Sequence, residues 1–454
     1  MFKYIEFLNM WVKLSKNLNL KSYDKFDWFL IICISLIPLS LAISIFVADF
    51  LASISGIYFI FLFIIKKQFK YLVIIKREIF FFTIFYSIIL FSLILTDYKS
   101  QSFLASFFYF RYFLLSLIIF YLLAKYKNFI QVLSILLVAT IFIVVFDALL
   151  QLITNQNLFG YQRIGTAIDV MPHLTGFFND EKKLGSYLAR FAALLISFSF
   201  IYSNKEKISK IILIIYPILF LVIFFSSERM GLFYGIIISI FYFLSTKGKN
   251  KINLTIISLI ITSLVFIYIN FEKNKNVYRL FDKYFNYTLE QVGIKKNPNY
   301  DKDYIRYFSQ EHENLAYTAV LIIKNDFLFG SGVKTFYQRC IDLKKSIKLV
   351  QNKRGNQIVC STHPHNYLLQ VFAEIGIFGL AILIIFLIIV IKNLIRYFFK
   401  KNKSNILISF FFINLSLLIN IFPFMPSGNF FNNWLSLILY FQIGIYLYYR
   451  KYLI

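Results

Sequence analysis

The chain has 454 residues, of which 59% are hydrophobic, 20% aromatic and only 15% charged. Soluble domains carry about a quarter charged residues, so this composition excludes an ordinary water-soluble globular protein. The formal net charge of +26 invites a nucleic-acid-binding interpretation. However, the basic residues flank long apolar runs, for example in the clusters 66–77, 247–251 and 392–403, as cytoplasmic loops of membrane proteins do. The sequence therefore predicts a protein of the lipid bilayer and no nucleic-acid partner.

The first segment, residues 1–27, places Phe2, Ile5, Leu8 and Val12 at helical spacing among lysines. It has no small-residue cleavage site and no short apolar core, so it is not expected to be a cleaved signal peptide. We expect an amphipathic helix on the cytoplasmic membrane surface.

Apolar runs of about 17 to 25 residues, the length that crosses the hydrocarbon core, follow along the chain. They predict an all-α polytopic membrane protein with about twelve spans, and stretches such as Ile211 to Phe225, apolar on every face, exclude a β-barrel. The expected spans lie near 28–46, 48–65, 78–95, 103–124, 129–152, 184–202, 210–226, 230–246, 252–270, 371–391, 405–422 and 433–449.

The basic loops set the orientation. An even number of spans places both termini on one side, and a cytoplasmic amino terminus puts every strongly basic loop inside. The sequence thus predicts a multi-pass membrane protein with both termini in the cytoplasm.

Two outer segments are long enough to carry function. Residues 153–183 connect the fifth and sixth spans, and residues 271–370 follow nine spans (28–270) and precede the last three (371–454). The second segment is rich in charged residues, so we expect a small, mainly helical periplasmic lid. Within it, Glu311 to Ile323 has the pattern of an amphipathic helix and Phe329 to Gly332 that of a turn.

Two of the three cysteines, Cys340 and Cys360, fall in this lid, whereas Cys33 lies in the first span. A disulfide between the lid cysteines would close a loop of about 20 residues in an oxidising compartment and stabilise it by about 3 kcal/mol. Two unpaired thiols are the alternative.

Where the lid returns to the membrane, the run Cys360 to Gln370 contains His363 and His365, two of the four histidines. Thr362 is a suitable helix cap, so we expect His365 in the first turn of the tenth span. The partial positive charge there favours a neutral imidazole, the form that a general base needs. A metal pair or a structural cap is the alternative, but no second cluster has zinc spacing, and no metal site is predicted.

The run from Cys360 to Gln370 and the residues after it also resemble the signature of a known family. His365-Asn366, nine residues, Gly376, two residues and Gly379 resemble the His-Asn and Gly-x-x-Gly signature of bacterial O-antigen ligases. Three further pieces agree in order, and the resemblance covers most of the chain from about residue 100 onward. These pieces are Thr175 to Glu181 with Gly185 to Leu188, Ser226 to Gly231, and Gly330 to Gly332 before Thr335-Phe336.

The resemblance implies a GT-C-like, metal-independent and inverting glycosyltransferase without cofactor. Its donor would be an undecaprenyl diphosphate-linked glycan, and its acceptor the lipid A-core or another glycan. Such a donor has two phosphates at the membrane surface, so the enzyme needs fixed cations at the outer boundary and a base for the acceptor hydroxyl. No ATP site is needed.

The arginines near the outer boundary are candidates for holding the phosphates. Arg229 follows the seventh span, while Arg190 and Arg111 lie inside spans, where a charge is costly and therefore a functional candidate. Two of these also have a structural interpretation, since Arg111 could pair with Asp147, and Arg229 could cap its helix or pair with Glu228.

One position departs from the family. Relatives often have arginine just before the Gly-Phe-Phe stretch, where this chain has His173. Either His173 or Arg163 could supply that contact, and Arg163 could instead be a solvated loop charge. Glu181, His363, Asn366 and Glu374 belong to the matching motifs and complete the expected substrate site.

The expected activity is glycan transfer on the periplasmic face, with His365, Arg229 and Arg190 as catalytic residues. The ligase is favoured, and a polymerase that joins repeat units is the alternative. A flippase for lipid-linked oligosaccharides is the alternative of another class, although related halves with broken helices, typical of transporters, are not seen. Two further motifs are discounted: Asp301-Lys302-Asp303 as a solvated charge cluster, and Gly330 to Thr335 as an incomplete phosphate-binding loop.

Overall fold

The computed structural model describes residues 23–67, 69–164, 173–201, 206–245, 309–346, 357–401 and 403–454. The predicted amino-terminal helix before residue 23, the predicted span 252–270 and the lid residues 271–308 and 347–356 lie outside them. The described part is helical and holds two isolated β-bridges but no sheet. Its helices are α2 (Lys25–Ile43), α3 (Ile45–Lys66), α4 (Lys70–Val73), α5 (Lys76–Leu95), α6 (Lys99–Phe107), α7 (Phe110–Lys125), α8 (Phe129–Thr154), η2 (Gly176–Phe178), α9 (Leu184–Ile201), α10 (Glu206–Phe225), α11 (Arg229–Ser245), α15 (Gln310–Asn325), α16 (Phe336–Ser346), α17 (Tyr367–Phe399), α18 (Asn405–Asn420) and α19 (Asn433–Tyr452).

Seven helical stretches of the described residues are long and apolar enough to cross a membrane. They are α2, α3, α5, the continuous pair α6 and α7, α8, α9 and α17. Shorter apolar helices are Ile214–Phe225 within α10, α11 and α18. Every predicted span except 252–270 coincides with a described helix or, for 103–124, with α6 and α7. The described part of the chain is therefore all-helical, and its apolar helices are those of a multi-pass membrane protein.

Helix α9 forms the centre of the bundle. Nearly all of its side chains from Leu184 to Ser199 are buried, because α10, α11 and α18 pack around it. Helix α5 has the opposite character, since most of its apolar side chains are exposed. In a bilayer the exposed surface of α5 meets lipid. The charged residue of α9, Arg190, is instead shielded from lipid by the surrounding protein.

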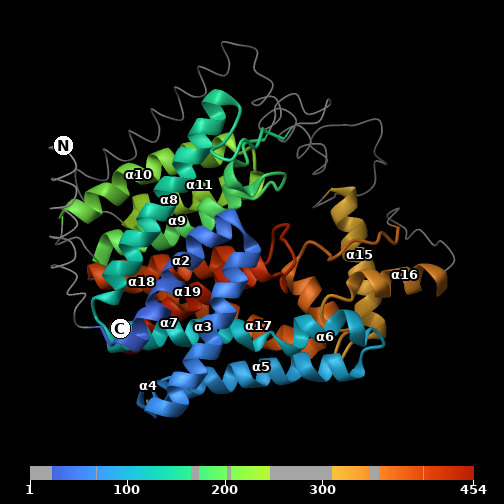
Figure 1. Ribbon diagram of the computed structural model, residues 1–454. Coiled ribbons are helices and arrows are strands. Elements are labelled where there is room, and N and C mark those ends of the chain that lie inside the picture. Colours follow the sequence, from blue (N-terminus) through green and yellow to red (C-terminus); the bar gives the residue numbers. More distant parts are fainter. Residues whose placement is uncertain are drawn as a thin grey trace.

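The two ends of the bundle differ. Figure 1 shows the short helix α4 and the carboxyl-terminal end of α19 on the left, and α15 and α16 on the right, beside the start of α17. The amphipathic helix that the sequence predicts over residues 311–323 is confirmed as α15, whose apolar face packs on α17. The long loops and the lid helices thus gather at the end of the bundle that is opposite α4.

Candidate functional site

The entry to α17 differs from the sequence prediction. Asn366, not Thr362, is the N-cap: its Oδ1 accepts the Leu369 N–H at 3.1 Å, and its Nδ2 donates to the Pro423 carbonyl at 2.8 Å. The prediction that His365 lies in the first helical turn is therefore wrong. His365 has φ of 54°, a left-handed conformation that cannot continue a helix, so it stands just before the cap.

The ring of His365 is oriented by one backbone carbonyl. His365 Nδ1 lies 3.3 Å from the Ser427 oxygen, and the Ser427 N–H donates to the His365 carbonyl at 2.8 Å. Because a carbonyl only accepts, Nδ1 must carry the proton in this contact. The neutral ring then has its lone pair on Nε2, which is the atom that can receive a proton.

His363 uses the same carbonyl from the other side. Its Nε2 lies 3.3 Å from the Ser427 oxygen, its Nδ1 lies 2.9 Å from the Thr362 hydroxyl, and its ring centroid is 4.1 Å from that of His365. Burial lowers the pKa of His363 to about 4, and burial also lowers the pKa of His365. Both imidazoles are therefore neutral at pH 7, and His363 acts as a support for His365.

A third histidine, His312, joins this pair from the first turn of α15. Its ring centroid lies 5.5 Å from that of His365, and its Nδ1 is 2.8 Å from the Ser309 hydroxyl, the cap of α15. Burial and the charges of His365 and Arg229 lower its pKa. Sequence reasoning did not select His312, because helical periodicity located α15 but could not show which residue its first turn would face.

Arg229 begins α11, directly after a tight turn in which Ser227 has φ of 59°. The preceding residue, Glu228, does not extend the site: its carboxylate accepts the N–H groups of Gly185 at 2.7 Å and Ser186 at 2.9 Å. Glu228 thereby caps α9, and burial raises its pKa to about 7. The charge of Arg229 also lowers the pKa of His312, the histidine whose ring lies 5.5 Å from that of His365.

The structure places the two candidates from the first outer segment, His173 and Arg163, in different surroundings. His173 is buried, with Nδ1 at 3.2 Å from the Ser226 carbonyl in the turn that leads to Arg229. Arg163 instead donates to the last carbonyls of α8, those of Gln151 at 3.1 Å and of Leu152. His173 is thus the one placed beside the Arg229 turn, whereas Arg163 caps a helix.

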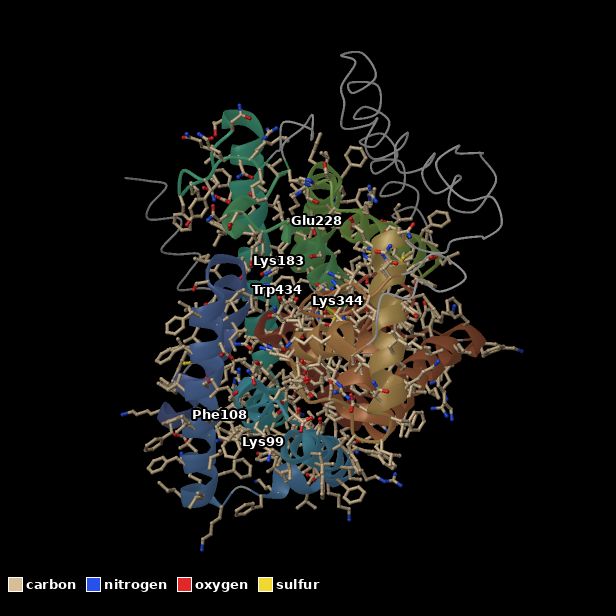
Figure 2. All side chains as sticks on the ribbon, turned by 90° about the vertical axis from the view of Figure 1, so that its right-hand side faces the viewer. Lys99, Phe108, Lys183, Glu228, Lys344 and Trp434 are labelled. Carbon is tan, nitrogen blue, oxygen red and sulfur yellow. A yellow bond between two sulfur atoms is a disulfide. The ribbon has the colours of Figure 1, made fainter. Side chains whose placement is uncertain are left out.

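Glu181 lies farther out, in a salt bridge with Lys183. The Lys183 ammonium is 5.6 Å from the ring of Trp434, at the start of α19. Figure 2, viewed from the side of α15 and α16, shows Lys183 and Trp434 next to each other with Glu228 above them. Glu181 therefore belongs to the rim of this end of the bundle.

Arg190 is buried, and it hydrogen-bonds to uncharged groups at the end of α18. Its Nη1 lies 3.0 Å from Asn420 Oδ1 and 3.4 Å from the Ile419 carbonyl, while its Nε has no hydrogen-bond partner among the described residues. Its guanidinium is 5.9 Å from the ring of Tyr234. Since Tyr234 lies on α11, Arg190 is near the helix that begins with Arg229.

The predicted pairing of Arg111 with Asp147 is wrong. Arg111 binds Asp49 of α3 with both ends of its guanidinium, at 3.0 and 3.3 Å. Asp147 instead accepts the Leu158 N–H at 2.9 Å, within the turn that follows its own helix. Sequence distance could not decide this, because Asp49 and Asp147 both lie within predicted spans that can meet α7.

Glu374 is buried at a break in α17. Gly376 has φ of 72°, and the loop after α15 enters the break, where the Ser331 N–H bonds to the Ala373 carbonyl and the Ile377 N–H to the Phe327 carbonyl. A side chain at Gly376 would collide with the Leu328 backbone. The Lys334 N–H donates to Glu374 Oε2 at 3.0 Å. The Gly-x-x-Gly part of the motif thus locks the lid turn onto α17.

The loop from residue 421 to 432, between α18 and α19, was not selected by sequence reasoning. It supplies the Ser427 and Pro423 carbonyls described above, and Asn429 and Phe430 both bond to Gln370, at 2.9 and 2.8 Å. Its sequence, Ile-Phe-Pro-Phe-Met-Pro-Ser-Gly-Asn-Phe-Phe-Asn, indicates only a turn. Its role in orienting His365 depends on a tertiary contact.

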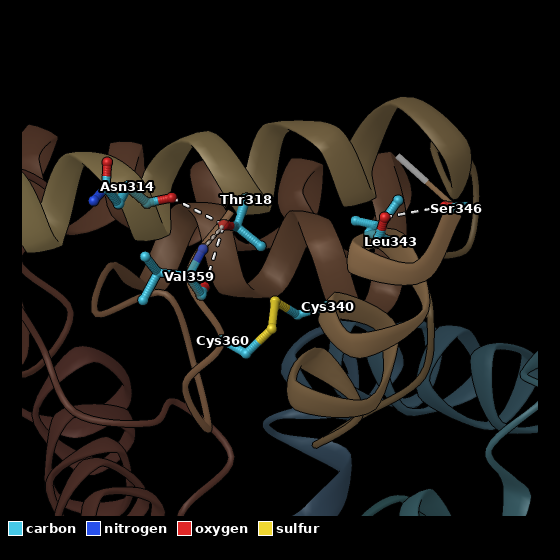
Figure 3. Close-up of a disulfide and its surroundings, with 7 residues drawn as sticks. All are labelled: Asn314, Thr318, Cys340, Leu343, Ser346, Val359 and Cys360. Atoms are coloured by element: carbon cyan, nitrogen blue, oxygen red, sulfur yellow. Dashed lines mark hydrogen bonds between the residues drawn. A yellow bond between two sulfur atoms is a disulfide. The ribbon is translucent and has the colours of Figure 1, made fainter. Parts of the chain in front are cut away.

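A disulfide joins Cys340 of α16 to Cys360, ahead of the histidines. Figure 3 shows this bond beside α15, where Thr318 Oγ1 accepts the Val359 N–H at 3.1 Å. The segment leading to His363 and His365 is therefore held to the lid helices at two adjacent points. No group of three or more His, Cys, Asp or Glu side chains in the described ranges is placed to hold a metal ion.

Comparison with known families gives one match. Residues 213–384 match the family described as O-Antigen ligase, and this range contains Arg229, His312, His363, His365 and the kink at Gly376. No curated protein matches the chain.

Proposed function

Because the chain carries the O-antigen ligase domain over residues 213–384, a domain shared by O-antigen ligases and polymerases, we propose that it transfers a glycan from undecaprenyl diphosphate to an acceptor such as the lipid A-core. The reaction takes place at the periplasmic face and uses neither metal nor ATP. The observation that carries this proposal is the orientation of His365, whose Nδ1 is committed to the Ser427 carbonyl, so that the lone pair on Nε2 is available to act as a base.

In the proposed step, Nε2 of His365 takes the proton of the acceptor hydroxyl while the hydroxyl oxygen bonds to the anomeric carbon of the donor. The bond from that carbon to the phosphate oxygen breaks on the opposite face of the sugar, so the configuration inverts. The undecaprenyl diphosphate leaves with the bonding electron pair. A fixed base contributes about 10² to 10⁴-fold to such a step, and fixed cations stabilise the charge that develops on the leaving group.

Arg229 and Arg190 are the proposed diphosphate ligands. Arg190 makes its hydrogen bonds to neutral oxygens, so its charge is not cancelled by a bonded carboxylate. His173 lies beside the Arg229 turn and is preferred over Arg163 as the additional donor, because the Arg163 guanidinium already binds the end of α8. Asn366, Glu374 and His363 act by holding the loop and helix that present His365.

The proposed topology has twelve spans with both termini in the cytoplasm of a bacterial inner membrane. The separation of α4 and the end of α19 from the lid helices supports it, since these elements lie at opposite ends of the bundle (Figure 1). The disulfide lies among the lid helices, which agrees with an oxidising periplasm on that side.

The same domain leaves a polymerase as the second candidate, differing only in the acceptor. Glycan analysis in a deletion strain separates the two. Polymer that accumulates on the carrier but not on the core indicates a ligase, whereas single repeat units on the core indicate a polymerase.

The decisive experiment replaces His365 with Ala and measures glycan transfer by purified, reconstituted protein. We expect a folded, inserted protein whose rate falls by about 10² to 10⁴-fold. Lys345→Ala, on an exposed side chain of α16, is the matched control and should keep the full rate. In the wild type the rate should fall only below pH 6.5, because burial lowers the pKa of His365 and the base must be unprotonated. Full activity of His365→Ala, in protein shown to be folded, contradicts the proposal.

A further inference from the structure

A cavity of about 280 Å³ that no histidine lines lies between α5, α17 and α19. Its wall is formed almost entirely by aromatic and aliphatic side chains. These are Phe81, Phe82, Phe85, Phe113, Ile382, Leu383, Ile385, Phe386, Ile389, Phe430, Leu439, Tyr440, Ile443, Tyr446 and Leu447. All three helices are apolar, and α5 exposes most of its length, so the cavity faces the bilayer.

The remaining lining residues are charged and lie at one end. They are Arg77 and Glu78 in the first turn of α5 and Arg450 in the last turn of α19. Glu78 binds both Arg450 and Lys451, at 3.5 and 3.0 Å, so one carboxylate is shared by two cations. Arg77 is exposed beside them. Three positive charges against one negative charge leave this end cationic, which suits an anion.

The length of the cavity along α19 matches the thickness of one leaflet of the bilayer. On α19 the lining runs from Leu439 to Arg450, which at 1.5 Å per residue is about 17 Å. Half of a hydrocarbon core of roughly 30 Å is about 15 Å. At the far end Phe430 closes the cavity, with its ring 5.7 Å from that of Tyr367, so the rings separate it from the histidine site.

A lipid chain that fills this cavity would give its apolar wall dispersion contacts that an empty cavity lacks. We propose that it is a binding site for one anionic phospholipid of the leaflet at the carboxyl-terminal end of α19. The acyl chain lies between α5, α17 and α19, and the headgroup phosphate contacts Arg77 and Arg450. The site is independent of the glycan-transfer proposal.

The test measures phospholipid retained by the full-length protein, with native mass spectrometry after extraction from vesicles of phosphatidylglycerol and phosphatidylcholine in equal amounts. We expect one phosphatidylglycerol to be retained by the wild type and at least tenfold less by Arg77→Ala/Arg450→Ala. Lys400→Ala/Lys401→Ala removes two equal charges from exposed positions outside the cavity and should retain the lipid.

A second pair of variants keeps the charges of Arg77 and Arg450 and tests the part of the cavity that would hold the acyl chain. Ile385→Trp fills the cavity from an exposed lining position, whereas Ile384→Trp places the same side chain on a neighbouring exposed residue outside the lining. Loss of the lipid only in Ile385→Trp supports the proposal. Equal retention in both tryptophan variants, equal retention of phosphatidylcholine in the wild type, or displacement of phosphatidylglycerol by an equimolar polyprenyl phosphate overturns it.

Discussion

Two clusters of charged side chains, at opposite ends of the helix bundle, are built in opposite ways. Near α4, buried Asp27 accepts from Lys125 at 2.5 Å and from the Tyr126 hydroxyl at 2.7 Å. At the lid end, Arg190 bonds to neutral oxygens, and the nearby carboxylates of Glu228 and Glu374 accept backbone N–H groups. The first cluster is neutral, because the charges of Asp27 and Lys125 cancel. In the second cluster Arg190 bonds to no carboxylate among the described residues, so it is the cation to test as a ligand of an anionic substrate.

The largest expected effect concerns the first cluster, that of Asp27 and Lys125. Asp27→Ala leaves Lys125 largely buried without its carboxylate, which should destabilise the protein by about 3 to 5 kcal/mol. Asp24→Ala, which removes the more exposed partner of Lys66 and a helix cap, is the control and should cost about 1 kcal/mol. Thermal unfolding in detergent measures both. The glycan-transfer rate per folded molecule should stay unchanged, and a specific loss of rate would remove the distinction between the two clusters.

The next effect tests the cationic cluster. Arg190→Gln keeps a side chain that can donate to Asn420 but removes the charge, so we expect stability near that of the wild type and a transfer rate lower by about 10² to 10³-fold. Unfolding and transfer are measured on the same preparation. A large loss of stability, with an unchanged rate per folded molecule, would show that Arg190 is structural like Asp27.

A smaller effect concerns Glu228, the cap of α9. Its pKa is about 7 in the folded protein, above its ordinary 4.5, because burial disfavours the charged form. Its contribution to stability is therefore full below pH 4.5 and is lost as pH rises through about 7. Between pH 5 and 8 the wild type should lose up to about 3 kcal/mol relative to Glu228→Gln. Parallel pH profiles of the two unfolding midpoints would refute this.

The smallest effect is spectroscopic and needs no substrate. Arg229→Gln should raise the pKa of His312, because the charge of Arg229 disfavours the protonated imidazole. The pKa of His363 is lowered by burial and by His365, so it serves as the internal control and should move much less. NMR titration of labelled histidines measures both. An unchanged His312 pKa would separate Arg229 from the histidine cluster.

Much of the architecture was readable from the sequence. Apolar runs fix helices because a bilayer leaves backbone groups no partner but their own helix, and all predicted spans within the described residues coincide with helices. The helix α15 followed from its periodicity, and the disulfide partners from the two lid cysteines. The motif around His365 singled out the loop before α17, whose local conformation was predicted wrongly.

What the sequence by itself determined was therefore the class of protein, its helices and the position of the histidine-containing loop along the chain. Tertiary structure alone decided that Arg111 pairs with Asp49, that the Ser427 carbonyl orients His365, and that His312 stands beside it. The reason is physical. Helix formation in a membrane depends on residues adjacent in sequence, whereas the tautomer, charge and partners of a side chain depend on groups that only the packing of distant helices brings within hydrogen-bonding range.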